Sequence, residues 1–427
     1  METIQDSDEE FYDAVEKSAD MVNDNSARNA NFNNDISDTQ SMTSNNSASA
    51  VTQTEDFLTH SPWLPKYKKR DKEFCEFQNF QLSQELGLTQ KSQSEFWIMK
   101  FSPNGRFLAI SGGCCVTSVY EISAFRNGDT QLLHPFPFIM FSEHTRAVTS
   151  ISWDCTSSRL LSSSLDGTVK LWLIGSESSI DTFQHPCGVN ACCFHPMNEN
   201  YFVTACQDRV IRLYKLPDRK IEGFYQTIDH IFSLAYSAEG QFLAAGLAKG
   251  QVMIYESRST DLRLRHSYTI LCRNRSGLRS KGRKVTAVEF MDCEHVLVTT
   301  NDSRIRLYKF TENLMMQKYK GGHFTKFPIK ASFSQDIGHV IASTERGRVI
   351  IWNTFGCLGV KRGVKNQSYE CFRARKRKVP EYSIFAPTVV LLKLRECHQL
   401  SNDKRDLRHI IITIGAKDTL RVFYNLF

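Results

Sequence analysis

One short stretch of the chain holds the three residue types of a nucleophilic triad. They are His144, Asp166 and either Ser162 or Ser164. In such a triad the histidine takes the proton of the serine, and the aspartate orients the imidazole. A similar set recurs about forty residues later, consisting of His185, Thr204 and Asp208. A buried carboxylate that orients an imidazole also serves a purely structural network. Because the set recurs, we interpret it as structural and predict no catalytic site.

The segments around these residues alternate between strand and turn patterns. Residues 148–153 predict a first strand, 159–167 a second strand with a tight turn, and 168–172 a third strand with alternating burial. Asp166 and Gly167 favour a hairpin at that turn, since both tolerate positive φ. The chain therefore contains a unit of antiparallel strands that could repeat.

This unit resembles the WD repeat. A turn position followed six residues later by an aromatic recurs in seven copies. The turn positions are Cys114, Asp166, Asp208, Lys249, Asp302, Arg346 and Asp418. The closing aromatics are Tyr120, Trp172, Tyr214, Tyr255, Tyr308, Trp352 and Tyr424. The resemblance implies an all-β, seven-bladed β-propeller over residues 74–427, and intervals longer than the ~40–45 residues of the repeat predict loop insertions.

In WD repeats a buried histidine, a serine or threonine, an aspartate and a tryptophan form a hydrogen-bonded network within a blade. The best match is His144, Ser162 or Ser164, Asp166 and Trp172, and the next is His185, Thr204, Asp208 and Tyr214. Asp302 and Asp418 hold the turn position in two further copies. The resemblance thus implies structural roles for these residues. We predict no cofactor and no metal, because the histidines at 134, 144, 185 and 195 lack metal-ligand spacing.

The chain before the first complete copy divides into three parts. Residues 1–60 have too few large apolar side chains to offset the entropy of ordering, which predicts a disordered tail. Residues 61–73 form a basic linker. Residues 74–82 carry regularly spaced apolar side chains, and we expect them to become the outer strand of the last blade. That pairing would close the ring and cover a sheet edge.

Charge is distributed unevenly along the chain. Residues 1–60 hold thirteen acidic and two basic residues, a net charge of −11, so the remainder carries +18 of the total of +7. Basic insertions are expected at 258–284 and 354–380. The second contains the candidate contacts for an anionic surface: Arg373, Arg375, Lys376, Arg377 and Lys378. Such runs bind anionic lipid headgroups, nucleic acid or an importin, or are ordinary solvated loop charge. An RNA-binding signature is absent, so nucleic acid is disfavoured.

One segment of the tail resembles the FFAT motif, two phenylalanines in an acidic tract, which the MSP domain of VAP proteins on the endoplasmic reticulum binds. The matching residues are Glu10, Phe11, Tyr12, Asp13, Ala14 and Glu16. The resemblance implies that Phe11 anchors in an apolar pocket, with Tyr12 at the place of the second aromatic. The surrounding acidic residues would speed encounter with a basic surface. The other interpretation is a solvated acidic tail with an incidental aromatic pair.

Four stretches together resemble the rabphilin-like WD-repeat proteins that bind the Rab GTPase of recycling endosomes. They are residues 8–14, 282–286, 297–308 and 329–334. In that family a long region between motif and propeller carries the Rab-binding segment, whereas about sixty residues precede the propeller here, which leaves Rab binding open. The resemblance implies a non-catalytic cytoplasmic scaffold, a trafficking adaptor that links a partner on the propeller to VAP proteins. It would associate peripherally with endosome or endoplasmic reticulum membranes, with no transmembrane segment.

An alternative is a nuclear scaffold or a ubiquitin-ligase substrate receptor, in which residues 373–378 would act as an import signal. Fold does not determine function, so the sequence leaves the partner of the propeller open.

Overall fold

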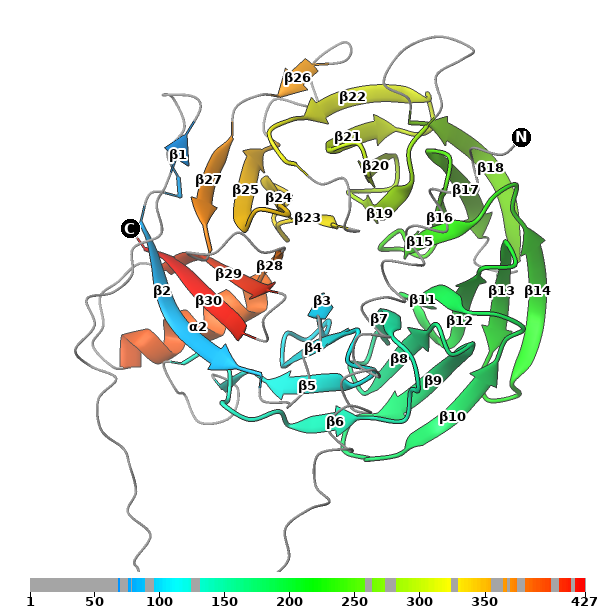
Figure 1. Cartoon of the computed structure of the whole chain (residues 1–427), viewed down its shortest axis with the longest axis horizontal. Coiled ribbons are helices and arrows are strands. Elements are labelled where there is room, and N and C mark those ends of the chain that lie inside the picture. The colour runs from blue at the N-terminus through cyan, green and yellow to red at the C-terminus, as the bar shows by residue number, and fades with distance from the viewer. Residues whose placement is uncertain are drawn as a thin grey trace, which may run out of the picture.

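Seven sheets, antiparallel except for one added strand in blade five, are arranged around one axis, so the prediction of a seven-bladed β-propeller is confirmed (Figure 1). The structure is a computed structural model. It describes residues 68–69, 76–77, 79–88, 96–123, 131–257, 263–272, 282–323, 329–354, 364–366, 369–374, 381–400, 407–415 and 419–426.

The first three blades each have four strands. Blade one consists of β3 (Phe96–Phe101), β4 (Phe107–Gly112), β5 (Thr117–Glu121) and β6 (Ile139–Phe141). Blade two consists of β7 (Val148–Trp153), β8 (Arg159–Ser164), β9 (Thr168–Leu173) and β10 (Ser179–Gln184). Blade three consists of β11 (Val189–His195), β12 (Asn198–Cys206), β13 (Val210–Lys215) and β14 (Lys220–Gln226).

The other blades follow the same order, with additions from distant segments. Blade four consists of β15 (Ile231–Tyr236), β16 (Phe242–Leu247), β17 (Gln251–Ser257) and β18 (Leu264–Leu271). Blade five consists of β19 (Val285–Phe290), β20 (His295–Thr300), β21 (Arg304–Lys309), β22 (Leu314–Tyr319) and β26 (Val364–Asn366). Blade six consists of β23 (Ala331–Phe333), β24 (His339–Ser343), β25 (Arg348–Asn353), β27 (Glu370–Arg373) and β1 (Lys68–Lys69). Blade seven consists of β28 (Glu381–Phe385), β29 (Leu407–Gly415), β30 (Thr419–Leu426) and β2 (Phe80–Gly87).

Burial explains the sequence pattern of the strands. The second strands β4 and β20 are buried along their whole length, because neighbouring blades cover both of their faces. Such strands are near-continuous apolar runs. The outer strand β10 instead alternates between exposed and half-buried residues over most of its length. Each of the seven closing aromatics named above lies on the third strand of its blade.

The ring closes by pairing the two ends of the propeller. Strand β2 runs antiparallel to β30, with Phe80 opposite Asn425 and Gly87 opposite Thr419. The predicted closing segment 74–82 was placed too early, since the strand spans Phe80–Gly87. Several positions of β2 are polar, so its apolar residues are less regularly spaced than those of 74–82 and the strand was not recognised from apolar spacing. Phe77 precedes the strand and is buried in the core between blades six and seven.

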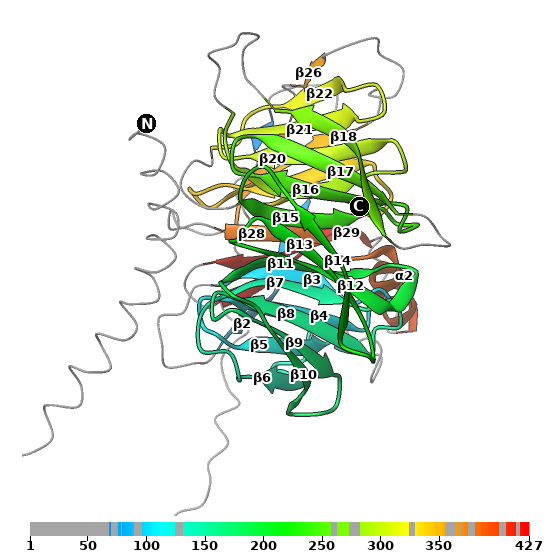
Figure 2. The same cartoon turned by 90° about the vertical axis from the view of Figure 1, so that its right-hand side faces the viewer.

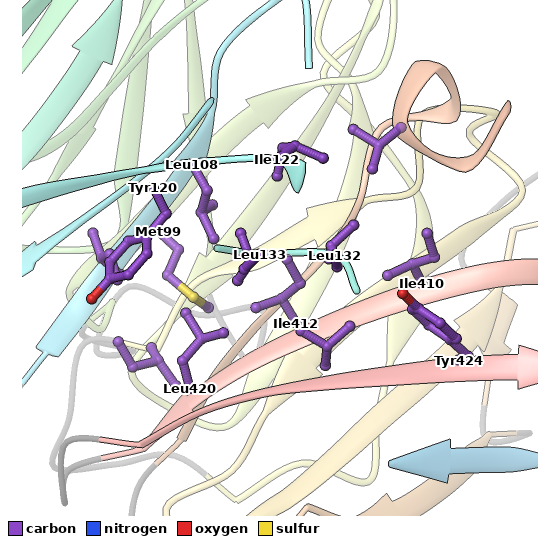
Figure 3. Close-up of a cluster of buried hydrophobic side chains, with 14 of the residues drawn as sticks. Met99, Leu108, Tyr120, Ile122, Leu132, Leu133, Ile410, Ile412, Leu420 and Tyr424 are labelled. Carbon is purple, nitrogen blue, oxygen red and sulfur yellow. The ribbon is translucent and has the colours of Figure 1, made fainter. Parts of the chain in front are cut away.

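An apolar core between blades one and seven holds the closure together (Figure 3). Met99, Leu108 and Tyr120 of blade one face Ile412 and Leu420 of blade seven. The pairing of β2 with β30 alone would stabilise the closed ring weakly, because a single strand pair buries little apolar area. The close-packed core across this boundary adds that buried apolar area.

The predicted extents of the basic segments are partly wrong. The expected insertion at 258–284 contains β18, the outer strand of blade four. The expected insertion at 354–380 contains β26, which pairs in parallel with β22, and β27, which pairs with β25. Within the expected linker, Lys68 and Lys69 pair with β27. Regular strand pairing thus extends into segments whose charge suggested loops.

A helix, α2 (Thr388–Leu400), lies between β28 and β29, beyond the end of the insertion expected at 354–380. Its Val390 and Leu394 are fully buried in the core between blades one and seven. Figure 2 places α2 at one face of the disc. Within the described part of the chain, no helix has the length and apolar character needed to cross a membrane.

Candidate functional site

The triad-like residues of blade two form one continuous network. His144 contacts Asp166 through Nδ1 at 2.8 Å and Ser162 through Nε2 at 2.7 Å. Trp172 donates from Nε1 to Ser162 Oγ at 2.8 Å. Thr168 donates from its hydroxyl to the Asp166 carboxylate at 2.6 Å. Burial would raise the pKa of Asp166, but the hydrogen bonds from His144 and Thr168 outweigh it and hold that pKa well below its usual range.

This geometry matches the connectivity of a catalytic triad, but the serine is inaccessible. Ser162 has no exposed surface, and Trp172 is equally buried against it. A nucleophile must reach a substrate carbonyl, so a serine sealed beneath an indole cannot attack one. Ser164 does not contact His144: its hydroxyl donates to the Arg146 carbonyl at 2.9 Å and accepts from the backbone N–H of Asp166 at 3.1 Å.

Blade three departs from the expected set. His185 Nε2 lies 3.0 Å from Thr204 Oγ1 and 3.2 Å from the Tyr214 hydroxyl. Asp208 does not complete this set, because its carboxylate pairs with Arg212 four residues later. Arg212 stands where Lys170 stands in blade two, and its guanidinium reaches back to the turn. The predicted grouping of Asp208 with His185 is therefore wrong.

Blade five repeats the arginine arrangement. Arg306 Nη2 donates to Asp302 at 2.7 Å, and Thr300 donates to the same carboxylate at 2.5 Å. Sequence reasoning missed Arg212 and Arg306. A signal was present, since in both blades an arginine follows the turn aspartate by four residues and precedes the closing tyrosine by two. Asp418, the remaining turn aspartate, lies outside the described residues.

One end of the propeller collects the turns that carry these carboxylates. Strands alternate in direction within a blade, so the turn between the second and third strands lies at the same end as the link to the next blade. We call this end the turn face. Its described residues are 113–116, 142–147, 165–167, 185–188, 207–209, 227–230, 248–250, 282–284, 301–303, 320–323 and 344–347.

The turn face is basic at its surface. Its exposed cationic residues are Arg146, Arg209, Lys249, Arg283 and Arg346. In the described ranges each acidic residue of the turn face contacts a lysine, an arginine or a histidine. Besides the pairs of Asp166, Asp208 and Asp302, these are Glu143 with Lys170, Asp229 with Lys249 at 3.1 Å and Glu345 with His323 at 3.8 Å. Pairing within and between blades therefore leaves a surface that favours an acidic partner.

The remaining candidate contacts divide between described and undescribed parts of the chain. Arg373 ends β27 and is half-buried. Arg375, Lys376, Arg377 and Lys378 lie outside the described residues. The FFAT-like segment 10–16 also lies outside them.

Two segments match the family pattern described as "WD domain, G-beta repeat", residues 137–172 and 177–215. The first match runs from β6 of blade one through the first three strands of blade two and includes the network of His144. The second runs from β10 of blade two through the first three strands of blade three and includes the set of His185. These matches and the seven blades support a WD-repeat β-propeller.

The chain is similar to several curated proteins. It is 34% identical to WD repeat-containing protein 44 of Xenopus laevis over 264 residues, 60% of this chain and 28% of that protein. An uncharacterised WD repeat-containing protein of Schizosaccharomyces pombe is 26% identical over 60% of this chain and 47% of its own length. Jouberin of Rattus norvegicus is 24% identical over 70% of this chain and 28% of its own length. The chain thus spans less than half the length of these relatives.

Proposed function

We propose that this chain is a non-catalytic scaffold that binds an acidic protein surface on its turn face. The observation that carries the proposal is the charge arrangement described above. Carboxylates of the turns contact lysine, arginine or histidine side chains, while Arg209, Arg283 and Arg346 lie exposed at the surface. A face of one charge sign accelerates encounter with a partner of the opposite sign and selects against others.

The proposed cellular role is a membrane-trafficking adaptor. The tail segment 10–16 would bind a VAP-type MSP domain on the endoplasmic reticulum, and the propeller would bind a partner on endosomes, with a Rab GTPase as one candidate. What supports this role is the sequence of the motif, in which Phe11 stands within an acidic tract. If the tail binds a protein of one membrane and the propeller binds a protein of another, the chain would link the two membranes.

Proximity labelling in cells tests the scaffold and the adaptor separately. The turn-face variant reverses two exposed charges, Arg283→Glu and Arg346→Glu. The matched control reverses Lys220 and Arg265, two exposed basic residues on the outer strands β14 and β18. The proposal expects the turn-face variant to lose the propeller's partners and the control to keep them.

The tail is tested in the same experiment by Phe11→Ala, which should remove labelled proteins of the endoplasmic reticulum and leave the others. Equal labelling by all variants would contradict a turn-face site. A wild-type set made up of nuclear proteins would favour the nuclear scaffold instead.

A further inference from the structure

Three ligand-type side chains from distant segments meet beside the ring closure. Glu76 precedes β2, His339 begins β24 of blade six, and His409 lies on β29 of blade seven. One ligand atom from each lies within 4.8 Å of those of the other two. His339 Nε2 is 2.8 Å from the Glu76 carboxylate. No sequence spacing could have indicated this group, because its members belong to three separate segments.

One imidazole of this group has an unsatisfied nitrogen. His339 is 4% exposed, and its Nδ1 has no hydrogen-bond partner among the described residues. Nε2 is the nitrogen that faces the Glu76 carboxylate, so a cation shared with Glu76 would bind Nε2, with the imidazole proton on Nδ1. A cation between the two side chains would replace their hydrogen bond with one bond to each.

The surroundings hold all three side chains in place. The Phe77 ring lies 4.9 Å from the rings of both His339 and His409. The Glu370 carboxylate accepts hydrogen bonds from the backbone N–H groups of Glu76 and Phe77 at 3.1 and 3.0 Å. Asn425 donates to the Glu76 carbonyl at 2.8 Å. Contacts that hold the segment of a ligand in place in this way orient it before the ion binds.

Access and charge are also suitable. The Glu76 side chain is 39% exposed, so solvent reaches one side of the group. The Asp336 carboxylate, which is exposed on the turn before β24, interacts electrostatically with both imidazoles. A cation would therefore have an entry path, and the attraction of Asp336 would act against the repulsion of Arg408, which also interacts with His409.

We propose that Glu76, His339 and His409 form a binding site for Zn²⁺ that fastens the closure of the propeller. Two imidazoles and one carboxylate are the nitrogen and oxygen ligands that Zn²⁺ prefers, and three protein ligands leave its fourth position for water. The ion would join the segment before β2 to blades six and seven. Because the unfolded chain cannot assemble the three ligands, binding would stabilise the folded ring.

The test uses the full chain, stripped with a chelator and then titrated with Zn²⁺ in a calorimeter. One ion per chain should bind, and the thermal midpoint should rise by several degrees. His409→Gln and Glu76→Gln should each weaken binding at least tenfold. The matched control is His295→Gln, because His295 is also a buried histidine paired with a carboxylate, Asp292 at 2.8 Å, but it belongs to no such three-residue group within the described part of the chain.

Cobalt substitution identifies the ligands independently. Co²⁺ should give the visible absorption of a four-coordinate nitrogen and oxygen site in the wild type and in His295→Gln, and lose it in His409→Gln. Melting curves without metal show whether each variant is folded. Absence of binding to the wild type, unchanged affinity in both ligand variants, or a thiolate-to-cobalt absorption band would overturn the proposal.

Discussion

Arg306 donates to the Asp302 carboxylate at 2.7 Å, and its side chain has no exposed surface. Asp302 holds the turn position that Asp166 holds in blade two, where His144 is the partner of the carboxylate. Both arrangements supply hydrogen-bond donors to a carboxylate that ends the turn between the second and third strands. Blades of one propeller thus satisfy the same turn with different partners, a cation in blade five and an imidazole in blade two.

We expect Asp166→Ala to lower the free energy of unfolding by about 1–3 kcal/mol, since His144 and Thr168 lose their acceptor in a buried site. Lys249→Ala is the control at the equivalent turn of blade four. The Lys249 side chain is 59% exposed and makes one surface ion pair, so its loss should cost much less. Urea denaturation measures both, and equal losses would contradict the alignment of the blades.

Arg306→Met should cost about 3–5 kcal/mol, because it leaves the Asp302 charge in a buried site without its cation. Arg212→Met should cost less, since Arg212 and Asp208 are 10% and 24% exposed. Adding Asp302→Asn to Arg306→Met should recover part of the loss. A double-mutant cycle from chemical denaturation checks the coupling, and additive losses would show that the pair is not coupled.

Stability should depend on pH through His185. Burial lowers the pKa of His185 to about 4, against the hydrogen bond to the Phe183 carbonyl, which raises it. In the unfolded chain the pKa is about 6.5. Between these values the unfolded state binds more protons, so the contribution of His185 is present above pH ~6.5 and is lost as the pH falls toward ~4.

His185→Gln removes this titration and keeps a side chain able to bond Thr204. The stability difference between wild type and His185→Gln should shift against the wild type as the pH falls from 7 to 4, as measured by urea melts at each pH. A difference that stays constant across that range would show that His185 does not titrate on unfolding.

A peptide of residues 4–18 should bind a VAP MSP domain, and Phe11→Ala should abolish the binding. A buried aromatic often dominates the binding energy of such an interface. The six acidic residues from Asp6 to Glu16 should make the affinity fall as salt rises. Val15→Ala is the control and should bind like the wild type. Fluorescence polarisation decides the matter, and equal binding by Phe11→Ala would remove the main support for the endoplasmic reticulum link.

The sequence by itself determined the architecture. Blade two shows why: it combines a strand pattern, a turn position at Asp166 and an aromatic six residues later, and the six-residue spacing from turn to aromatic recurs in every blade. Local periodicity reports which face of a strand is buried, and each blade is one such local unit. The turn position and closing aromatic could therefore be read along the whole propeller.

Only the tertiary structure decided which partners the polar side chains choose and how the ring closes. The sequence offers both His185 and Arg212 as partners for Asp208. In the folded blade the Asp208 carboxylate forms its ion pair with the Arg212 guanidinium. The closing strand β2 was harder to predict, because one of its buried residues is polar. Gln84 donates a hydrogen bond from its amide to the Leu133 carbonyl of blade one at 2.6 Å. The grouping of Glu76 with His339 and His409 spans three segments. Contacts of this kind form only when distant segments pack together, so no spacing within the sequence encodes them.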